Sequence, residues 1–413
     1  MLPARAIMYA LIVAVLIALM SAALIQLADL NRSLQNDQFD QERLIRNLNS
    51  AVSLALSDDK TAIEEKTLDL YGKKQDSVTF SRIYWGFFLA GYARAFGSNS
   101  FSRDSVQKSF LLGSPDNSTL ASALYLPDYN SPLAVTGSTM IIGNAVLPKA
   151  GIKSMTISGV SYVRAKLMFG QQFVSTSQFP NIDKSKIESI LKEQKNFSGT
   201  IKEIPKFIAR AFSEKTLVLS GDSMYLDNCT LKGNIIIKAK KGITIGRNCH
   251  IENAIVLAPS IRFVSGFQGE LQAFAENEMI IESEVKLDYP SVIGILRGAN
   301  NPQNQAILKI ETRSVIEGTV IAWQDKSNKK PILATIENRA FIRGQLFIDG
   351  LLELKGIVHG NVTTQGFFLR AGGGFYEGVL MDGTIDRTQL SSFYLSPLLF
   401  DEKQRVKVVK WLE

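Results

Sequence analysis

The longest apolar run of the chain lies close to its N-terminus. From Ala6 to Ala28 the sequence contains no charged residue, and a helix needs about 20 apolar residues to cross the hydrocarbon core of a bilayer. The run exceeds the roughly 7–15 residues of a signal-peptide core. A transmembrane anchor is therefore favoured over a signal peptide cleaved near Ser21–Ala23. Arg5 on the short side indicates a cytoplasmic N-terminus, with the bulk of the chain periplasmic or extracellular.

Apolar residues keep a helical spacing beyond this run, and Asn and Gln fill the other positions. No proline or glycine interrupts the chain between Pro3 and Gly72. We therefore expect one continuous helix from about residue 6 to 56, made of a transmembrane anchor (1–28) and a helical stalk (29–57). The spaced apolar positions are Leu27, Leu30, Leu34, Leu44, Leu48 and Val52.

Residues 58–130 have the pattern of a small β-rich unit. Ser81–Phe96 is rich in aromatic residues, but its uncharged core is too short to span a bilayer and carries two glycines, which favours a buried strand or hairpin. The short runs SFLLG and ALYLP indicate further strands. The proline-bounded stretch Pro127–Pro132 marks the end of this unit.

From Leu133 the chain alternates short β-branched runs with glycine and asparagine, and several of these units resemble one another. In the clearest pair, Ile310, Ile316, Gly318 and Val320 recur as Ile336, Ile342, Gly344 and Leu346. Such repeats predict a parallel β-helix, in which equivalent residues stack about 4.8 Å apart and insertions leave at the corners. Val320 and Leu346 should then be core residues one coil apart.

The expected fold is mainly β. After the helix and the small β-rich unit it comprises a parallel β-helix (131–400) and a C-terminal tail or strand (401–413). A helical insertion at 183–213 interrupts the β-helix. Its spacing predicts two short amphipathic helices, with Ile187, Ile190 and Leu191 on one face and Ile204, Phe207 and Ile208 on the next. We expect this pair to follow the first coil and to cap the open end of the stack.

The two cysteines occur in the same short phrase, Asn228-Cys229 and Asn248-Cys249. A stack places Cys229 beside Cys249, Leu231 beside Ile251 and Ile236 beside Val256. An envelope location permits a disulfide, and neighbouring coils lie within the bonding range. Side chains in a parallel register point the same way, however, which favours two reduced, stacked cysteines.

The few residues that suggest chemistry do not form a recognisable site. His250 and His359 are the two histidines; alternation places His250 in solvent between inward Cys249 and Ile251, and a catalytic base is the weaker alternative. Glu282, Glu284 and Asp288 are spaced to share one side of a strand, as a glycosidase would require, although solvated strand ends are the simpler interpretation. The glycines of Ala371–Gly378 indicate a turn. We assign no catalytic, cofactor-binding or metal-binding residue.

Charge adds little to this picture. The chain has 46 basic and 39 acidic residues, a net charge of +7, which is small for its length and does not indicate nucleic-acid binding. The local basic runs, 238–241 and 326–330, have a solvated strand end or turn as their simplest interpretation. The expected partners are the membrane and proteins of an envelope assembly, and a glycan is a further candidate.

The overall architecture resembles two families. A very short polar leader and an apolar helix that continues into an amphipathic half, before a β-rich head, resemble type IV pilins and minor pseudopilins; Ile7–Leu11, where pilins carry a glutamate, is apolar. The head resembles bactofilin-like stacked-coil scaffolds. These resemblances imply a non-catalytic, membrane-anchored component of a secretion, pilus-like or surface-assembly apparatus. A membrane-tethered carbohydrate-active enzyme and a carbohydrate-binding or adhesin-like head are the alternatives, and a groove with converging charges and flanking aromatics would favour them.

Overall fold

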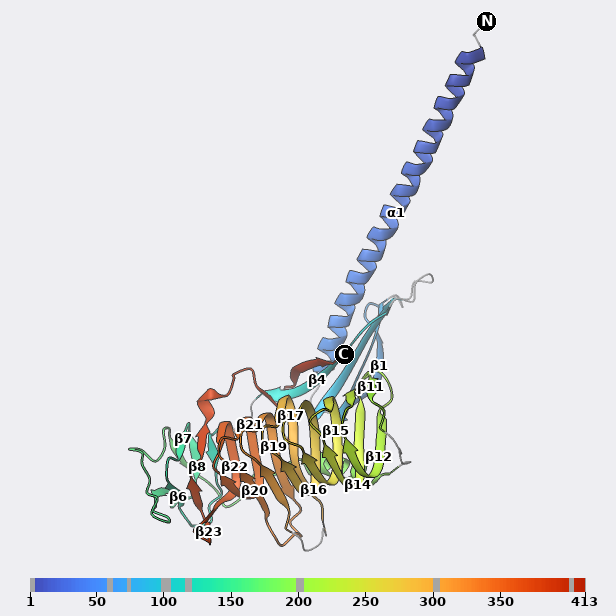
Figure 1. Ribbon diagram of the computed structural model, residues 1–413. Helices are drawn as coiled ribbons and strands as arrows, with labels where there is room; N and C mark the ends of the chain where they lie inside the picture. The colour runs from blue at the N-terminus through green and yellow to red at the C-terminus, as the bar shows by residue number, and fades with distance from the viewer. Residues whose placement is uncertain are drawn as a thin grey trace. The chain divides into compact units, whose positions relative to one another are not determined.

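A computed structural model describes residues 4–57, 62–72, 76–97, 105–115, 121–197, 204–299, 305–400 and 405–412 of the chain. The chain divides into two compact units. The first comprises residues 1–57, 64–81 and 92–108, and the second comprises residues 58–63, 82–91 and 109–413. As the sequence predicts, the protein is mainly β and carries one long N-terminal helix (Figure 1).

Helix α1 (Ala4–Ser57) is uninterrupted over 54 residues, about 80 Å at 1.5 Å per residue, which confirms the expected continuous helix (Figure 1). Every side chain from Ala6 to Phe39 is exposed. The apolar part is long enough to cross a membrane. By length and composition α1 is therefore a candidate membrane anchor.

The C-terminal turns of α1 are buried within the first unit. Asn47 Nδ2 donates a hydrogen bond to Asp76 Oδ1 over 2.8 Å, and Arg43 Nε lies 3.3 Å from the same oxygen. These contacts connect the helix to the start of β2. The buried apolar residues are Leu44, Leu48, Ala51, Val52 and Ala55, so one end of the predicted stripe is core, whereas its other members, Leu27, Leu30 and Leu34, are exposed.

A small sheet follows the helix. Gly86 and Phe87 form the turn between its second and third strands, which confirms the hairpin predicted for Ser81–Phe96. Both C-terminal strands pair antiparallel with its fourth strand, so the expected C-terminal strand is also present. The strands, in sheet order, are β1 (Ile63–Asp69), β2 (Asp76–Trp85), β3 (Phe88–Gly97), β4 (Ser105–Pro115) and β26 (Leu395–Ser396), with β27 (Lys407–Leu412) also on β4.

From residue 121 most strands pair in parallel and join into a closed arrangement. β15 (His250–Phe263) shows the pattern: its first part pairs with β13 (Thr230–Gly233), and its second and third parts pair with two parts of β14 (Ile235–Ile245). β16 (Gln268–Ile281) repeats these three pairings on the other side of β15. We call a stretch of chain that pairs in this way a rung; the rungs from β12 to β22 lie side by side in Figure 1.

The strands of the second unit that are not yet located are β5 (Leu124–Tyr125), β6 (Leu133–Thr136), β7 (Met140–Ile142), β8 (Ala145–Leu147), β9 (Ile152–Ser154), β10 (Gln172–Val174), β11 (Phe207–Arg210), β12 (Leu217–Leu226), β17 (Lys286–Arg297), β18 (Ile307–Ile310), β19 (Val315–Gln324), β20 (Ile332–Ile336), β21 (Phe341–Leu354), β22 (Ile357–Ala371), β23 (Gly374–Glu377), β24 (Val379–Met381) and β25 (Thr384–Asp386).

The register of these strands follows the sequence repeat. Val320 pairs with Leu346 and both are fully buried, as predicted, and Leu231 pairs with Ile251. The expected pairing of Ile236 with Val256 is wrong by one residue, because Ile236 pairs with Ile255. The remaining members of the clearest repeat pair as predicted: Ile310 with Ile336, Ile316 with Ile342 and Gly318 with Gly344.

One corner of the rungs requires glycine. Gly318, Gly344 and Gly360 occupy the same register position on successive rungs and have φ angles of 145°, 144° and 155°. A Cβ on Gly344 would lie 1.9 Å from the carbonyl oxygen of Gly318, and one on Gly360 would lie 1.7 Å from that of Gly344. The neighbouring backbones therefore approach more closely than any other residue allows.

The order of the rungs in space differs from their order along the chain. β22 pairs with β25 through Ile357 and Thr384, and with β5 through Val362 and Leu124. β25 pairs with β7, and β5 pairs with β8, which pairs with β10. The strands of residues 121–174 thus extend the arrangement beyond its C-terminal rungs. The strands that come before α2 in the chain therefore lie next to the C-terminal rungs and not next to β12.

Residues 175–197 follow β10 in the chain, and we call them the crossover. The rings of Phe179 and Phe347, on β21, are 5.0 Å apart. Further along, Lys238 Nζ of β14 lies 2.6 Å from Glu193 Oε1. The crossover therefore passes from the later rungs to the earlier ones across the outer side of the strands.

The crossover contains α2 (Lys184–Lys195), which begins where the sequence predicts. Asp183 is its N-cap and accepts a hydrogen bond from the Ser185 backbone N–H over 3.0 Å. Ile187, Ile190 and Leu191 are buried in a cluster that includes residues of β16 and β17, and each such burial stabilises by about 1.5–3 kcal/mol. The helix therefore covers a lateral face, and the expectation that it caps an open end is wrong.

The prediction of a second helix within 183–213 is also wrong for the residues from 204 onward that the structure describes. Phe207–Arg210 forms β11 and pairs in parallel with β13, and residues 198–203 lie outside the described residues. In a strand Phe207 and Ile208 face opposite sides, and Phe207 is accordingly exposed. Pairing with a neighbouring rung decides in favour of the strand, because it provides backbone partners that an isolated short helix lacks.

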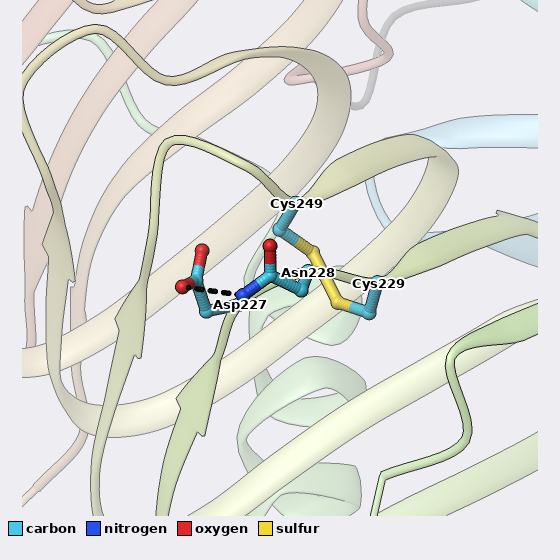
Figure 2. The surroundings of a disulfide bond; sticks show 4 residues. All are labelled: Asp227, Asn228, Cys229 and Cys249. Carbon is cyan, nitrogen blue, oxygen red and sulfur yellow. Dashed lines mark hydrogen bonds between the residues drawn. A yellow bond between two sulfur atoms is a disulfide. The ribbon is translucent and has the colours of Figure 1, made fainter.

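Cys229 and Cys249 form a disulfide, with their Cα atoms 4.7 Å apart (Figure 2). The expectation of two reduced cysteines is wrong. Both residues lie one position before the paired strands begin, at Thr230 and His250. Parallel alternation does not constrain their side chains there, and the Cα separation lies within the usual range of about 4.4–6.8 Å. The bond links two successive rungs.

Replacing Leu346 with aspartate should destabilise the protein strongly. Leu346 is fully buried beside Val320, so the new carboxylate would lie unpaired in the core at a cost of several kcal/mol. We expect the melting temperature of the full-length protein, followed by circular dichroism, to fall by several degrees or more. Ile307→Asp, at an exposed apolar position, is the control and should change stability by less than about 1 kcal/mol. Equal melting temperatures for both variants would contradict the observed register.

Candidate functional site

The two histidines lie apart and in different settings. His250 is exposed between buried Cys249 and Ile251, as predicted, and its Nε2 is 3.9 Å from Glu252 Oε2. His359 is half-buried, with its ring 4.7 Å from that of Phe341, and burial lowers the pKa of its imidazole. Among the described residues no group of three His, Cys, Asp or Glu side chains is arranged to hold a metal ion.

Glu282 and Glu284 lie outside strands, in the connection between β16 and β17, so strand alternation does not bring them to one side. The simpler interpretation of solvated strand ends holds, because the side chains of Glu284 and Asp288 are accessible to solvent. Each glutamate pairs with its own cation: Glu282 Oε1 is 3.0 Å from Arg262 Nη1, and Glu284 Oε1 is 2.8 Å from Arg313 Nη2. Asp288 is 2.8 Å from Lys286. The glycines 372 and 373, both with positive φ, form the turn between β22 and β23, as predicted for Ala371–Gly378.

A second group of charges lies near the C-terminal strand. Lys410 Nζ is 2.9 Å from Glu252 Oε1 and 2.6 Å from Glu270 Oε2. Its hydrogen bond lowers the pKa of Glu252, whereas burial raises the pKa of Glu270 despite the same lysine. We interpret this group as a connection between β27 and two successive rungs.

A polar cleft of about 620 Å³ lies on the outer side of the strands, within the range of roughly 300–1,000 Å³ typical of small-molecule sites. Four stretches of chain form it: the connection between β5 and β6, the crossover, the end of β19 with the loop to β20, and the later rungs β21 and β22. The lining residues are Tyr129, Ser177, Gln178, Phe179, Pro180, Asn181, Lys184, Trp323, Gln324, Lys326, Asn328, Lys329, Pro331, Asp349 and Gln365.

The loop of residues 325–331 is a structured wall of the cleft. Asp325 Oδ1 accepts a hydrogen bond from the Ser327 backbone N–H over 2.9 Å, and this bond lowers the pKa of Asp325. Asn328 Nδ2 donates to the carbonyl oxygens of Asp325 and Gly298, each over 3.0 Å. These bonds fix the loop while its lysines 326 and 329 are exposed.

One carboxyl group lies in the cleft. Asp349 accepts hydrogen bonds from the Gln365 side chain and from the backbone of Gln324. Burial raises its pKa, although these bonds and the nearby Lys326 act in the opposite direction. Burial likewise raises the pKa of Tyr129, with Asp349 as a further cause. A single acid that is already hydrogen-bonded lacks the second carboxylate that glycoside hydrolysis requires.

The sequence identified part of this cleft but not its chemistry. The basic run at 326–330 was expected to be a solvated turn, and it is a loop of this kind. The polar insertion between two copies of the clearest repeat was the available signal, because insertions leave a stack at its corners. No sequence signal marks the other polar residues of the cleft, because the residues around them form ordinary strand or turn patterns. They are Asp349, Gln365 and Tyr129.

Comparison with protein-family models, curated proteins and solved structures finds no match to this chain.

Replacing Asp349 with asparagine should stabilise the protein at neutral pH. Because burial raises the pKa of Asp349 in the folded state, its favourable contribution is complete below the ordinary aspartate pKa of about 3.9 and is lost as the pH rises through the raised value. The neutral amide avoids this loss. We expect a melting temperature above that of the wild type at pH 7, with the difference shrinking toward pH 3.5.

Asp222→Asn is the control, because Asp222 lies on the surface in an exposed ion pair with Lys240. It should leave the melting temperature nearly unchanged at both pH values. A lower melting temperature of Asp349→Asn at both pH values would show instead that the hydrogen bonds to the carboxylate outweigh its burial.

Proposed function

We propose that this protein is a non-catalytic, membrane-anchored structural component of an envelope secretion, pilus-like or surface-assembly apparatus. The observation that carries the proposal is the presence of a long, exposed apolar helix in a chain whose β-rich part holds Glu282, Glu284 and Asp288 each in its own ion pair. An anchor of this kind holds a folded head at a membrane. The head then acts by binding and positioning rather than by chemistry.

The parallel strands of the second unit support a finer description of the head. Equivalent residues of successive rungs pair in register, as Gly318, Gly344 and Gly360 do. We propose that these rungs are the coils of a parallel β-helix, similar to a bactofilin-like scaffold. The continuous helix α1 with its buried C-terminal stripe supports the resemblance to pseudopilin-like proteins. In a β-helix each coil contacts only its neighbours, so a rigid support can be built from short repeated segments.

The proposed location follows from the anchor. Arg5 precedes the apolar run and acidic residues follow it, so we propose that the N-terminus is cytoplasmic and that the β-rich part is periplasmic or extracellular. The disulfide between Cys229 and Cys249 supports this location, because disulfides persist in oxidising compartments. A membrane-tethered carbohydrate-active enzyme is the weaker alternative, since its paired carboxylates would have to converge.

The full-length protein should behave as an integral membrane protein. The apolar segment of α1 is exposed throughout, and burying it in the bilayer is its most favourable state. After cell fractionation, we expect the intact chain to stay in the membrane pellet through high-salt and carbonate washes. Deleting residues 6–28 should release it. A soluble wild-type chain that begins near Ala23 or Ala28 would show that the segment is a cleaved signal peptide.

The double variant His250→Ala, His359→Ala should retain full function. The exposed ring of His250 contributes within about 0.5 kcal/mol, and loss of the His359 contact with Phe341 costs on the order of 1 kcal/mol. We expect the variant to complement the phenotype of a deletion strain completely. If either histidine were a general base, its removal would lower the reaction rate by roughly 10²–10⁴-fold. Failed complementation at normal protein level and stability would contradict the non-catalytic assignment.

A further inference from the structure

The cleft between the crossover and the 325–331 loop has an excess of cationic groups. Lys184, Lys326 and Lys329 line it and are exposed. Within the part of the chain that the structure describes, none of these ammonium groups forms an ion pair within 4.0 Å, whereas the lysines along the rungs commonly do. The nearest acids are Asp325, at the edge, and Asp349. The cleft therefore favours an anionic ligand.

The rest of the lining matches a hydroxylated ligand. Five amide side chains, each of which both donates and accepts hydrogen bonds, line the cleft together with the exposed ring of Tyr129 and the edge of Trp323. No leucine, isoleucine, valine or methionine is among the lining residues, and the apolar surface of the cleft comes from aromatic rings and prolines. Aromatic rings beside amides accommodate a ligand with one apolar face and a polar rim, as a sugar ring has.

Two of these amides are incompletely satisfied. Gln324 Oε1 and Asn328 Oδ1 are buried and have no hydrogen-bond donor among the described residues. A buried acceptor without a donor is uncommon in native proteins and indicates a missing partner. Sugar hydroxyls are donors of the required kind. Both oxygens are shielded from solvent. Turning the Asn328 amide would break its bonds to the carbonyl oxygens of Asp325 and Gly298, so Gln324 is the amide that turns toward a ligand.

We propose that this cleft binds an acidic oligosaccharide, one whose sugar rings carry carboxylate groups. The ammonium groups of Lys326, Lys329 and Lys184 pair with the carboxylates, Tyr129 stacks on a ring face, and the amides bind hydroxyls. Asp349 is the only carboxyl group in the lining, so the cleft lacks the carboxylate pair of glycoside hydrolysis, and the proposal is one of binding. The inference goes beyond the proposed structural role and does not depend on the anchor, since every residue of the cleft belongs to the second unit.

Calorimetric titration of the full-length protein in detergent tests the proposal. The probes are trigalacturonate, the neutral trisaccharide maltotriose and inorganic phosphate. We expect trigalacturonate to bind at least tenfold more tightly than either of the others, and to bind more weakly as salt is raised from 50 to 500 mM, because salt screens ion pairs. Equal binding of maltotriose, or no binding of trigalacturonate at millimolar concentration, would overturn the proposal. Equal binding of phosphate would also overturn it by indicating a general anion site.

Matched variants locate the binding. Lys326→Gln with Lys329→Gln should weaken trigalacturonate binding by about tenfold or more, because two charge-assisted contacts are lost. The control Lys153→Gln with Lys215→Gln removes the same charge from exposed positions elsewhere and should leave affinity within about twofold. Equal losses in both double variants would show only long-range attraction and would overturn the assignment to the cleft.

Two substitutions at Tyr129 separate ring stacking from hydrogen bonding. Tyr129 is 53% exposed, so neither change disturbs the core. Tyr129→Phe keeps the ring and should retain affinity within about threefold, whereas Tyr129→Ala should weaken binding about tenfold. Equal, unchanged affinity in both variants would overturn the stacking role. None of these results depends on membrane attachment or on complementation, so a failure here is distinguishable from a failure of the structural role.

Discussion

The parallel register between neighbouring rungs is the constraint on which the rest of the molecule depends. Inward residues such as Val320 and Leu346 pack on their equivalents, and the backbones at Gly318, Gly344 and Gly360 approach so closely that a Cβ would overlap a neighbouring carbonyl oxygen. A rung can therefore neither slide nor separate without losing core contacts and backbone hydrogen bonds together. The disulfide between Cys229 and Cys249 adds a covalent link between two rungs.

Ion pairs on the outer surface follow the same register. Arg262 with Glu282, Arg313 with Glu284 and Arg343 with Glu317 each join successive rungs. Exposed pairs of this kind contribute about 0–1 kcal/mol each, so they add little to stability. They do neutralise Glu282, Glu284 and Glu317, and where two carboxylates converge, at Glu252 and Glu270, Lys410 bridges them.

The candidate binding cleft lies where the chain leaves the rungs. Residues 121–174 lie beyond the C-terminal rungs, so the crossover must return along the outer side of the strands to reach β11. That path buries α2 against a lateral face. It also places Phe179 and Lys184 opposite the 325–331 loop. A cleft with three lysines and five amides thus arises from the topology of the chain, at a place where no backbone pairing restricts the choice of residue.

The sequence by itself determined the features that depend on local periodicity. The charge-free run of α1, the hairpin of Ser81–Phe96 and the pairing of Ile316 with Ile342 follow from spacing, because burial on one face repeats with the period of the element. The pairing of Ile236 was wrong by one residue, because the corner after Glu252 has one residue fewer than the corner after Lys232.

Only the tertiary structure decided which distant segments meet. It decided the spatial order of the rungs, the identity of β11 as a strand, the disulfide and the position of Asp349 beside the 325–331 loop. These features depend on long-range pairing between segments whose local sequences suit more than one neighbour. The physical reason is that the free N–H and C=O groups at the edge of a strand can hydrogen-bond to many other strands. Only the packing of the whole chain selects the strand that pairs there.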